Sequence, residues 1–323
     1  MPRAARHIFL VIFLSVIILF FSIKNANAQV GPSVNLIVTP QSVAPNQNVT
    51  FSVESFSFDI NSATVSWYIN GKLIKKAVGE KTFNVTVGKA GTATIVLAHI
   101  VATSGIVVDK TVTLRPNTVN LIWEAKTYTP PFYKGKALFT FQSDVRFSAL
   151  ATIIGKNGRI SPQNLIYTWS VNGEIQGNKS GYGKNTLTVT GSIIPRPINV
   201  SVAVTTQDKT INASADISLA ASSPQILFYE NNPLYGIIYE HAIPNAISLK
   251  SKEIKMTAVP YFFSNASNLT YSWNVNNTDI SPPEINSLTL RNTGDAGTSF
   301  VSLNIQNALK DLQGGRGAFS IQF

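Results

Sequence analysis

Apolar and polar residues alternate along much of the chain, and one alternating phrase recurs three times. Each copy contains a tryptophan and ends in two small residues: Trp67-Tyr68-Ile69-Asn70-Gly71, Trp169-Ser170-Val171-Asn172-Gly173 and Trp273-Asn274-Val275-Asn276-Asn277. A period of two predicts a strand with one buried face. Asn-Gly and Asn-Asn pairs tolerate the positive φ of a two-residue hairpin turn. We therefore expect each phrase to be a core strand that leads into a tight hairpin.

The tryptophans recur about every hundred residues, which is the size of one β-sandwich with a tryptophan in its core. Short alternating segments with glycine and proline between them fill the rest of each repeat, and no segment has a sustained helical period with caps. We predict an all-β chain of three tandem immunoglobulin-like antiparallel β-sandwiches after an N-terminal hydrophobic segment. The expected parts are a signal peptide or membrane anchor over 1–28 and domains over 29–116, 117–221 and 222–323.

Individual strands follow from the same alternation. In the first repeat we expect strands at 34–39, 48–56, 63–70, 81–87, 92–101 and 106–114. After the second and third tryptophans we expect them at 186–190, 198–205, 210–219, 287–291, 298–306 and 318–323.

Residues 1–28 have the features of an export signal. Arg3, Arg6 and His7 precede an apolar run over 8–23, and Ala26-Asn27-Ala28 is a small-residue cleavage site. The run is shorter than the roughly 20 residues that a membrane-spanning helix needs. We therefore expect cleavage after Ala28 in preference to an uncleaved anchor. In both cases residues 29–323 would lie outside the cytoplasm, secreted or associated with the cell surface.

The composition narrows the chemistry. Charged residues make up 13% of the chain, about half of an average soluble protein's share. The chain has no cysteine, which excludes disulfides, thiolate zinc sites, a cysteine nucleophile and lipid attachment at a cysteine. The net charge is +10, but the basic residues are scattered. This pattern favours a mildly basic solvated surface over a polyanion-binding one.

Residues suited to catalysis are sparse. The histidines are His7, His99 and His241, and no two of them have metal-ligand spacing. No serine lies in a Gly-x-Ser-x-Gly motif. Asp279 and Glu284 flank a Pro-Pro pair, and Asp295 lies in a glycine turn that lacks the pattern of a calcium loop. We predict no catalytic, metal-binding or cofactor-binding residues, and so no enzyme.

Two aromatic loops exceed what a sandwich needs. When Glu124 is aligned with Glu230, Tyr133 falls opposite Tyr239, so the second and third repeats share a proline- and aromatic-rich opening that the first lacks. The candidate ligand-binding residues are Trp123, Tyr128, Phe132, Tyr133, Tyr235 and Tyr239. They are suited to stack on a sugar or a partner protein. The favoured alternative is that they seal domain boundaries, because each loop follows a linker.

The order of a tryptophan strand, a small turn, a glycine-containing hairpin and a Val/Thr-rich strand resembles PKD domains and related bacterial immunoglobulin-like domains. PKD domains usually have Trp-x-Phe-Gly-Asp-Gly, whereas this chain has Ile69-Asn70-Gly71 and its two counterparts. The missing Asp-Gly favours a divergent immunoglobulin-like sandwich. The phrase Pro130-Pro131-Phe132-Tyr133-Lys134-Gly135-Lys136 is similar to one in uncharacterised secreted bacterial proteins. That resemblance implies a location and no activity.

These features predict a non-catalytic exported surface protein that is a structural spacer or an adhesion module, including a component of a surface appendage. The alternative is a module that binds carbohydrate or cell-wall polymer through loops 123–136 and 228–241. The expected partners are other surface proteins or cell-wall glycans, with no specific nucleic acid. The membrane would be a partner only through an uncleaved N-terminal segment.

Overall fold

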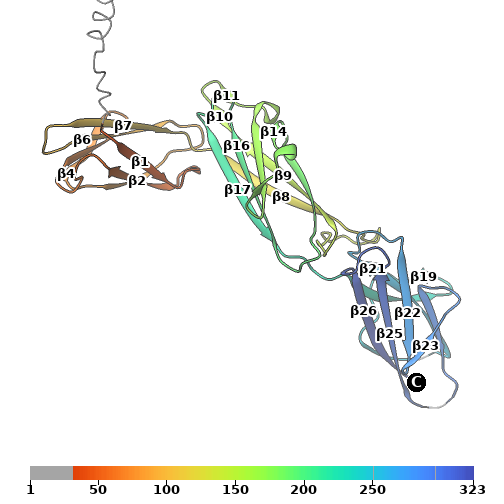
Figure 1. Cartoon of the computed structure of the whole chain (residues 1–323). Coiled ribbons are helices and arrows are strands. Elements are labelled where there is room, and N and C mark those ends of the chain that lie inside the picture. Colours follow the sequence, from red (N-terminus) through yellow and green to blue (C-terminus); the bar gives the residue numbers. More distant parts are fainter. Residues whose placement is uncertain (1–31, 250, 295) are drawn as a thin grey trace, which may run out of the picture. The chain divides into compact units, whose positions relative to one another are not determined.

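The computed structural model describes residues 32–249, 251–294 and 296–323 (Figure 1). These ranges contain strands, turns and two short 3-10 helices, Pro162–Asn164 and Gly177–Lys179, and no α-helix. No helix within them is long and apolar enough to cross a membrane. The expected leader, with its apolar run over 8–23 and the cleavage site after Ala28, lies outside the described residues, as does Asp295.

The described residues form two compact units. One unit comprises 32–39, 50–84 and 95–112. The other comprises 40–49, 85–94 and 113–323.

The first Trp phrase lies in a sandwich of two antiparallel sheets. One sheet has the order β1-β2-β5 and contains Val34–Thr39, Asn48–Ser55 and Thr82–Thr86. The other has the order β4-β3-β6-β7 and contains Lys72–Val78, Thr64–Ile69, Thr94–Val101 and Val107–Leu114. Trp67 is fully buried between them. Its ring stacks on Phe83 with centroids 5.2 Å apart and lies 6.3 Å from Phe51.

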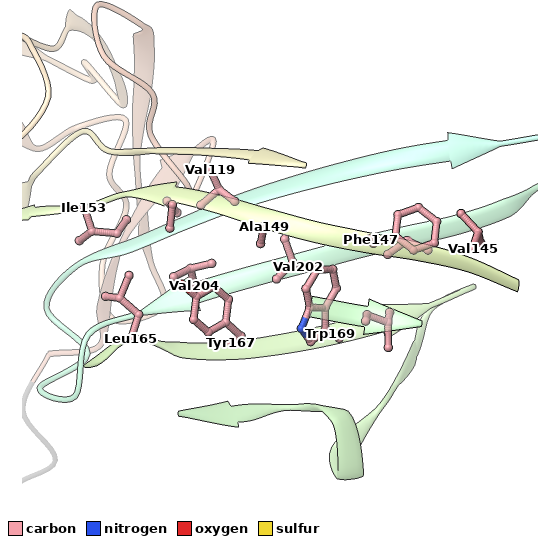
Figure 2. Packing of buried hydrophobic residues seen from close by; sticks show 14 of the residues in the cluster. Val119, Val145, Phe147, Ala149, Ile153, Leu165, Tyr167, Trp169, Val202 and Val204 are labelled. Carbon is pink, nitrogen blue, oxygen red and sulfur yellow. The ribbon is translucent and has the colours of Figure 1, made fainter. Parts of the chain in front are cut away.

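The second sandwich surrounds Trp169. One sheet has the order β15-β9-β8, formed by Thr186–Thr190, Asp144–Thr152 and Thr118–Lys126. The other has the order β13-β12-β16-β17, with β14 also paired to β12; its strands are Glu174–Ile175, Ile166–Val171, Ile198–Thr205, Asn212–Leu219 and Gly181–Tyr182. A small hairpin joins β10 (Ile154–Gly155) to β11 (Gly158–Arg159). Figure 2 shows Phe147 and Val145 of β9 facing Trp169 of β12 and Val202 of β16 across the core.

The third sandwich surrounds Trp273. One sheet has the order β19-β18-β21-β24, formed by Gly236–Ile237, Gln225–Asn232, Glu253–Tyr261 and Ser287–Arg291. The other has the order β20-β26-β25-β22-β23, formed by Ala246–Ser248, Gly314–Gln322, Thr298–Asn307, Leu269–Val275 and Thr278–Ile280. Phe228, Phe319 and Leu303 pack with Trp273 in the core. The all-β, immunoglobulin-like sandwich prediction is confirmed.

The three Trp phrases have the same local structure. Each tryptophan is buried, and its indole N–H donates a hydrogen bond to a backbone carbonyl on a later loop: Glu80 at 3.3 Å, Lys184 at 2.7 Å and Ile285 at 2.8 Å. A buried tryptophan needs such a partner because its N–H has left water. The turn pairs Asn70-Gly71, Asn172-Gly173 and Asn276-Asn277 all have positive φ, as the sequence predicts.

Three strand predictions need correction. The segment Lys72–Val78 forms β4, which was not predicted because nearly all of its residues are exposed and show no alternation. Strand β26 begins at Gly314, earlier than the predicted 318, because its first residues, Gly314-Gly315-Arg316-Gly317, show no alternation of apolar and polar side chains. Gly317 lies against the Phe228 ring of β18 and has no room for a side chain. Strand β20 pairs with β26 in parallel, so the third sandwich is not wholly antiparallel.

Candidate functional site

The aromatic loop of the second sandwich reaches the third sandwich. A turn over 130–133 begins the approach, closed by a hydrogen bond from the Tyr133 N–H to the Pro130 carbonyl at 2.9 Å. Pro131 occupies the second position of this turn, where its fixed φ is favoured. The turn presents Phe132 and Tyr133, which are both half-buried, to aromatic residues of the third sandwich.

Phe132 lies at the centre of this aromatic cluster. Its ring stacks on Tyr239 with centroids 3.8 Å apart. It also meets the edges of Tyr229 at 5.7 Å and Tyr261 at 6.5 Å. Edge-to-face and stacked pairs each add about 0.5–1.5 kcal/mol beyond the area they bury. We call the six residues Phe132, Tyr133, Tyr229, Tyr239, Tyr261 and Phe262 the aromatic junction.

Tyr133 supports the junction from the other side. Its ring makes T-shaped contacts with Tyr261 at 5.5 Å and Phe262 at 5.7 Å. Its hydroxyl donates to the Lys136 carbonyl at 3.4 Å and lies over Gly135, which has no space for a Cβ atom. The Tyr-Lys-Gly-Lys phrase is therefore explained by packing within the loop.

A pair of buried hydroxyls lies inside the junction. The Tyr229 and Tyr261 hydroxyl oxygens are 2.7 Å apart and share a hydrogen bond. Burial, reinforced by this hydrogen bond, raises the pKa of Tyr261 well above its ordinary value. The Tyr261 phenol therefore stays neutral at physiological pH.

Backbone hydrogen bonds cross the junction beside the rings. The Tyr128 N–H donates to the Phe263 carbonyl at 2.6 Å, and the Phe262 N–H donates to the Tyr128 carbonyl at 2.7 Å. The Thr140 hydroxyl donates to the Phe262 carbonyl at 2.8 Å, and both residues are buried. Tyr128 therefore contributes to the contact between the two sandwiches through its backbone, whereas the sequence predicted a role for its ring.

A second set of hydrogen bonds involves the two residues that follow Thr140 in the chain. The Leu312 N–H donates to the Gln142 side-chain oxygen at 2.8 Å, and the Gln313 amide donates to the Phe141 carbonyl at 2.8 Å. The Lys310 ammonium donates to the Gln142 carbonyl at 2.5 Å. The two sandwiches are thus joined by polar contacts as well as by aromatic packing.

Two bulky residues at this contact adopt left-handed backbone conformations. Phe262 has a φ of 64° and Gln142 a φ of 59°. Such a conformation costs a non-glycine residue about 1–3 kcal/mol and persists where surrounding contacts determine it. Both residues take part in the hydrogen bonds that cross between the sandwiches, so these contacts hold the strained conformations in place.

Two of the predicted site residues lie outside the junction. The Trp123 ring is covered by the Lys136 ammonium, 3.3 Å from its centroid, which is a cation–π contact within the second sandwich. Tyr235 lies at the tip of the β18–β19 hairpin and is 82% exposed. The six candidates therefore do not form one surface: Phe132, Tyr133 and Tyr239 are in the junction, Tyr128 borders it, and the other two are separate.

The ion pairs found among the described residues lie in the first and third sandwiches. His99 Nδ1 lies 2.6 Å from Asp109, on neighbouring strands of the first sandwich. The Lys255 ammonium lies 2.8 Å from Glu284 and lowers the pKa of that exposed carboxyl. Within 32–249, 251–294 and 296–323, no three His, Asp or Glu side chains are close enough to hold a metal ion.

The sequence analysis missed Tyr261 and Phe262, which receive the aromatic loop. They follow the alternating part of β21 in the run Val259-Pro260-Tyr261-Phe262-Phe263, where every residue is buried. A strand with one solvated face should alternate. The loss of alternation at this end of β21 was the available sign of a second buried face.

Two of three comparisons with known proteins give no match, and the third gives distant similarities to solved structures. No protein-family model matches the chain. No curated protein matches it. The three N-terminal domains of the bacteriophage RB49 Hoc capsid protein are 13% identical over 90% of this chain and 98% of that one, with a TM-score of 0.26.

Two further solved structures are similar at the same level. The fibronectin(III)-like modules of Clostridium thermocellum CbhA are 17% identical over 59% of this chain and 94% of that one, with a TM-score of 0.29. The Bacteroides ovatus mixed-linkage glucan protein SGBP-B, solved with a heptasaccharide, is 10% identical over 90% of this chain and 70% of that one, with a TM-score of 0.23. All three TM-scores are below 0.5, so these likenesses carry no argument about the fold or the function of this chain.

Proposed function

We propose that this protein is an exported, non-catalytic spacer in which the aromatic junction fixes the second sandwich to the third. The observation that carries the proposal is the stacking of Phe132 on Tyr239 within a cluster that also includes Tyr229 and Tyr261. A flexible tether between two domains would need none of these contacts. A spacer that must hold its ends apart uses such aromatic contacts, because they restrict the motion of one sandwich relative to the next. In this role the protein presents loops to surface proteins or wall glycans.

The export part of the proposal depends on the sequence. The basic start, the apolar run over 8–23 and the Ala26-Asn27-Ala28 site together favour a cleaved signal. N-terminal sequencing of the exported chain tests it, with Gln29 expected first and Met1 contradicting cleavage.

The alternative function, glycan binding by loops 123–136 and 228–241, requires free aromatic faces. One face of Phe132 is occupied by Tyr239, and the Tyr133 ring makes T-shaped contacts with Tyr261 and Phe262. Tyr235 alone among the six candidates is mostly exposed. This distribution favours the sealing role for the loops.

The two roles predict different effects on stability. For the spacer, Phe132→Ala and Tyr133→Ala each remove packed aromatic surface, and we expect each to lower the Tm of the chain by about 4 °C or more. Tyr235→Ala removes an exposed ring from the same pair of loops, so it is the matched control and should leave the Tm unchanged. Scanning calorimetry of residues 29–323 measures all three. An unchanged Tm in Phe132→Ala and Tyr133→Ala would contradict the sealing role and favour a free stacking platform.

A further inference from the structure

A polar hollow of the third sandwich lies on the solvent face of its five-stranded sheet, away from the junction residues. It has a volume of about 580 Å³. Side chains of β22, β23, β25 and β26 line it, together with Asn245 before β20. The opposite face of the same strands carries the core residues Trp273, Leu303 and Phe319.

The strand register fixes how the lining residues adjoin. Asn274 of β22 lies opposite Asp279 on one side and Ser302 on the other. Asn304 of β25 lies opposite Ser272 and Arg316. Directly opposite residues on neighbouring strands point to the same face. The longer polar side chains therefore stand in two adjacent rows across the sheet.

Small residues leave space between the longer side chains. Ser302 lies opposite Ala318, and Phe300 lies opposite Ser320. A row of alanine and serine beside asparagine, arginine and phenylalanine produces a hollow where equal side chains would produce a flat surface. Because these positions are on paired strands, the hollow has a rigid floor.

Phe300 is an aromatic residue of the hollow that does not belong to the core of the third sandwich. It occupies an outward position of β25 and is 66% exposed, whereas its neighbours Ser302 and Asn304 on the same face are polar. Its ring makes none of the aromatic contacts found in the described ranges. An aromatic ring free on a polar sheet face offers an apolar plane beside hydrogen-bonding groups.

The polar groups of the hollow are available to a ligand. The Asn274 amide donates to Asp279 at 2.9 Å, which orients both side chains and leaves acceptor positions open. Within the described residues, the Arg316 guanidinium and the Asn304 amide have no hydrogen-bond or ion-pair partner among the protein side chains. Amide, carboxylate and guanidinium groups can each bind two neighbouring hydroxyls at once.

The charged residues that line the hollow indicate whether a neutral or an anionic ligand fits it better. It contains one cation, Arg316, and one carboxylate, Asp279. A different hollow of about 600 Å³, in the second sandwich, is lined by Arg115, Lys156 and Arg159 with only Asp208 against them. That second hollow would suit an anion, whereas the balanced charge on the third sandwich suits a neutral ligand.

We infer that the outer face of the β20-β26-β25-β22-β23 sheet is a binding site for a neutral oligosaccharide. The Phe300 ring would cover the apolar C–H face of one sugar, and Asn274, Asp279, Asn304 and Arg316 would bind hydroxyls of that sugar and the next. The site shares no residue with the aromatic junction and does not depend on the spacer role.

Affinity electrophoresis of residues 29–323 through gels that contain a soluble glucan, mannan, galactan or xylan tests the inference. At least one of these neutral polysaccharides should retard the chain. Phe300→Ala and Arg316→Ala should each weaken binding, so that the dissociation constant obtained from the retardation rises about tenfold. Phe56→Ala is the matched control, because Phe56 is another exposed phenylalanine, at 75%, in the first sandwich; it should bind like the unaltered chain.

Two outcomes would overturn the inference. One is that none of the four neutral polysaccharides retards the chain. The other is that Phe300→Ala and Arg316→Ala bind as tightly as the unaltered chain while circular dichroism shows that both variants are folded. A failure here would leave the calorimetric test of the junction unaffected.

Discussion

At the scale of single residues, the asparagine of each Trp phrase does more than form a turn. The Asn70 side chain accepts a hydrogen bond from the Ile95 N–H at 2.9 Å, Asn172 accepts one from Asn199 at 3.0 Å, and Asn276 accepts one from Phe300 at 2.8 Å. In each case the asparagine's own N–H donates to the carbonyl of the same partner. The asparagine therefore fastens the hairpin to the next strand of its sheet.

The sequence predicts half of this arrangement. An Asn-Gly or Asn-Asn pair after an alternating strand is a local signal, and the positive φ values follow from it. The partner strand is 24 to 27 residues further along the chain, so no local pattern reveals it. Three identical contacts in three repeats explain why asparagine, and not only glycine, recurs at this position.

Asn172 offers a test of this double role. Asn172→Ala should destabilise the second sandwich by about 2 kcal/mol, because it loses a hydrogen bond and places an alanine at positive φ. Asn172→Gly keeps the turn and loses only the side-chain bond, so it should cost about 1 kcal/mol. Urea unfolding followed by Trp fluorescence measures both. Asn178→Ala, an exposed asparagine, is the control; equal stability of all three variants and the unaltered chain would refute the role.

At the scale of elements, most strands are predictable because their burial alternates. Strands β1, β15, β16 and β24 have the predicted bounds. Strand β4 was missed because a sheet-edge strand with lysines and apolar residues exposed on both faces carries no period-two signal. Only its pairing with β3, through the Asn70-Gly71 turn, makes it a strand.

The aromatic loops were predictable as unusual elements, and their partner was not. Their composition singled out Phe132, Tyr133 and Tyr239, which the structure brings together. The receiving residues Tyr261 and Phe262 are more than a hundred positions away from the loop of the second sandwich, as the 122-residue separation of the Thr140–Phe262 bond shows. Contacts at that range depend on how two sandwiches meet, which periodicity does not encode.

The buried tyrosine pair makes the junction sensitive to alkali. In the unfolded chain Tyr261 ionises near pH 10, whereas burial and the bond to Tyr229 raise its pKa in the folded protein. The unfolded state therefore loses the proton first, and the stability that this phenol contributes is present below about pH 10 and is lost as the pH rises above that value. We expect the Tm to fall above pH 10 and to fall less in Tyr261→Phe.

Calorimetry between pH 8 and 11 measures this difference. Part of the alkaline loss should remain in the variant, because burial also raises the pKa values of Tyr167 and Tyr271. Tyr235→Phe alters an exposed phenol and is expected to follow the unaltered chain. Parallel curves for Tyr261→Phe and the unaltered chain would show that the pair does not govern the junction's alkaline response.

At the scale of the molecule, the proposed spacer role depends on coupling between the second and third sandwiches. Aromatic stacking, the backbone bonds of Tyr128 and the contacts of Gln142 cross between them within one compact unit. Domains of one chain are expected to move relative to each other unless contacts between them prevent it. Here the strained conformations of Phe262 and Gln142 would be released if the two sandwiches separated.

The most direct test is a distance distribution between these two sandwiches. The chain has no cysteine, so Thr188→Cys on β15 and Thr289→Cys on β24, both exposed, give two unique sites for spin labels. In residues 29–323, double electron–electron resonance should give one narrow distribution, and adding Phe132→Ala with Tyr133→Ala should broaden it. A distribution that is already as broad with the junction intact as without it would contradict the coupling on which the proposed spacer role depends.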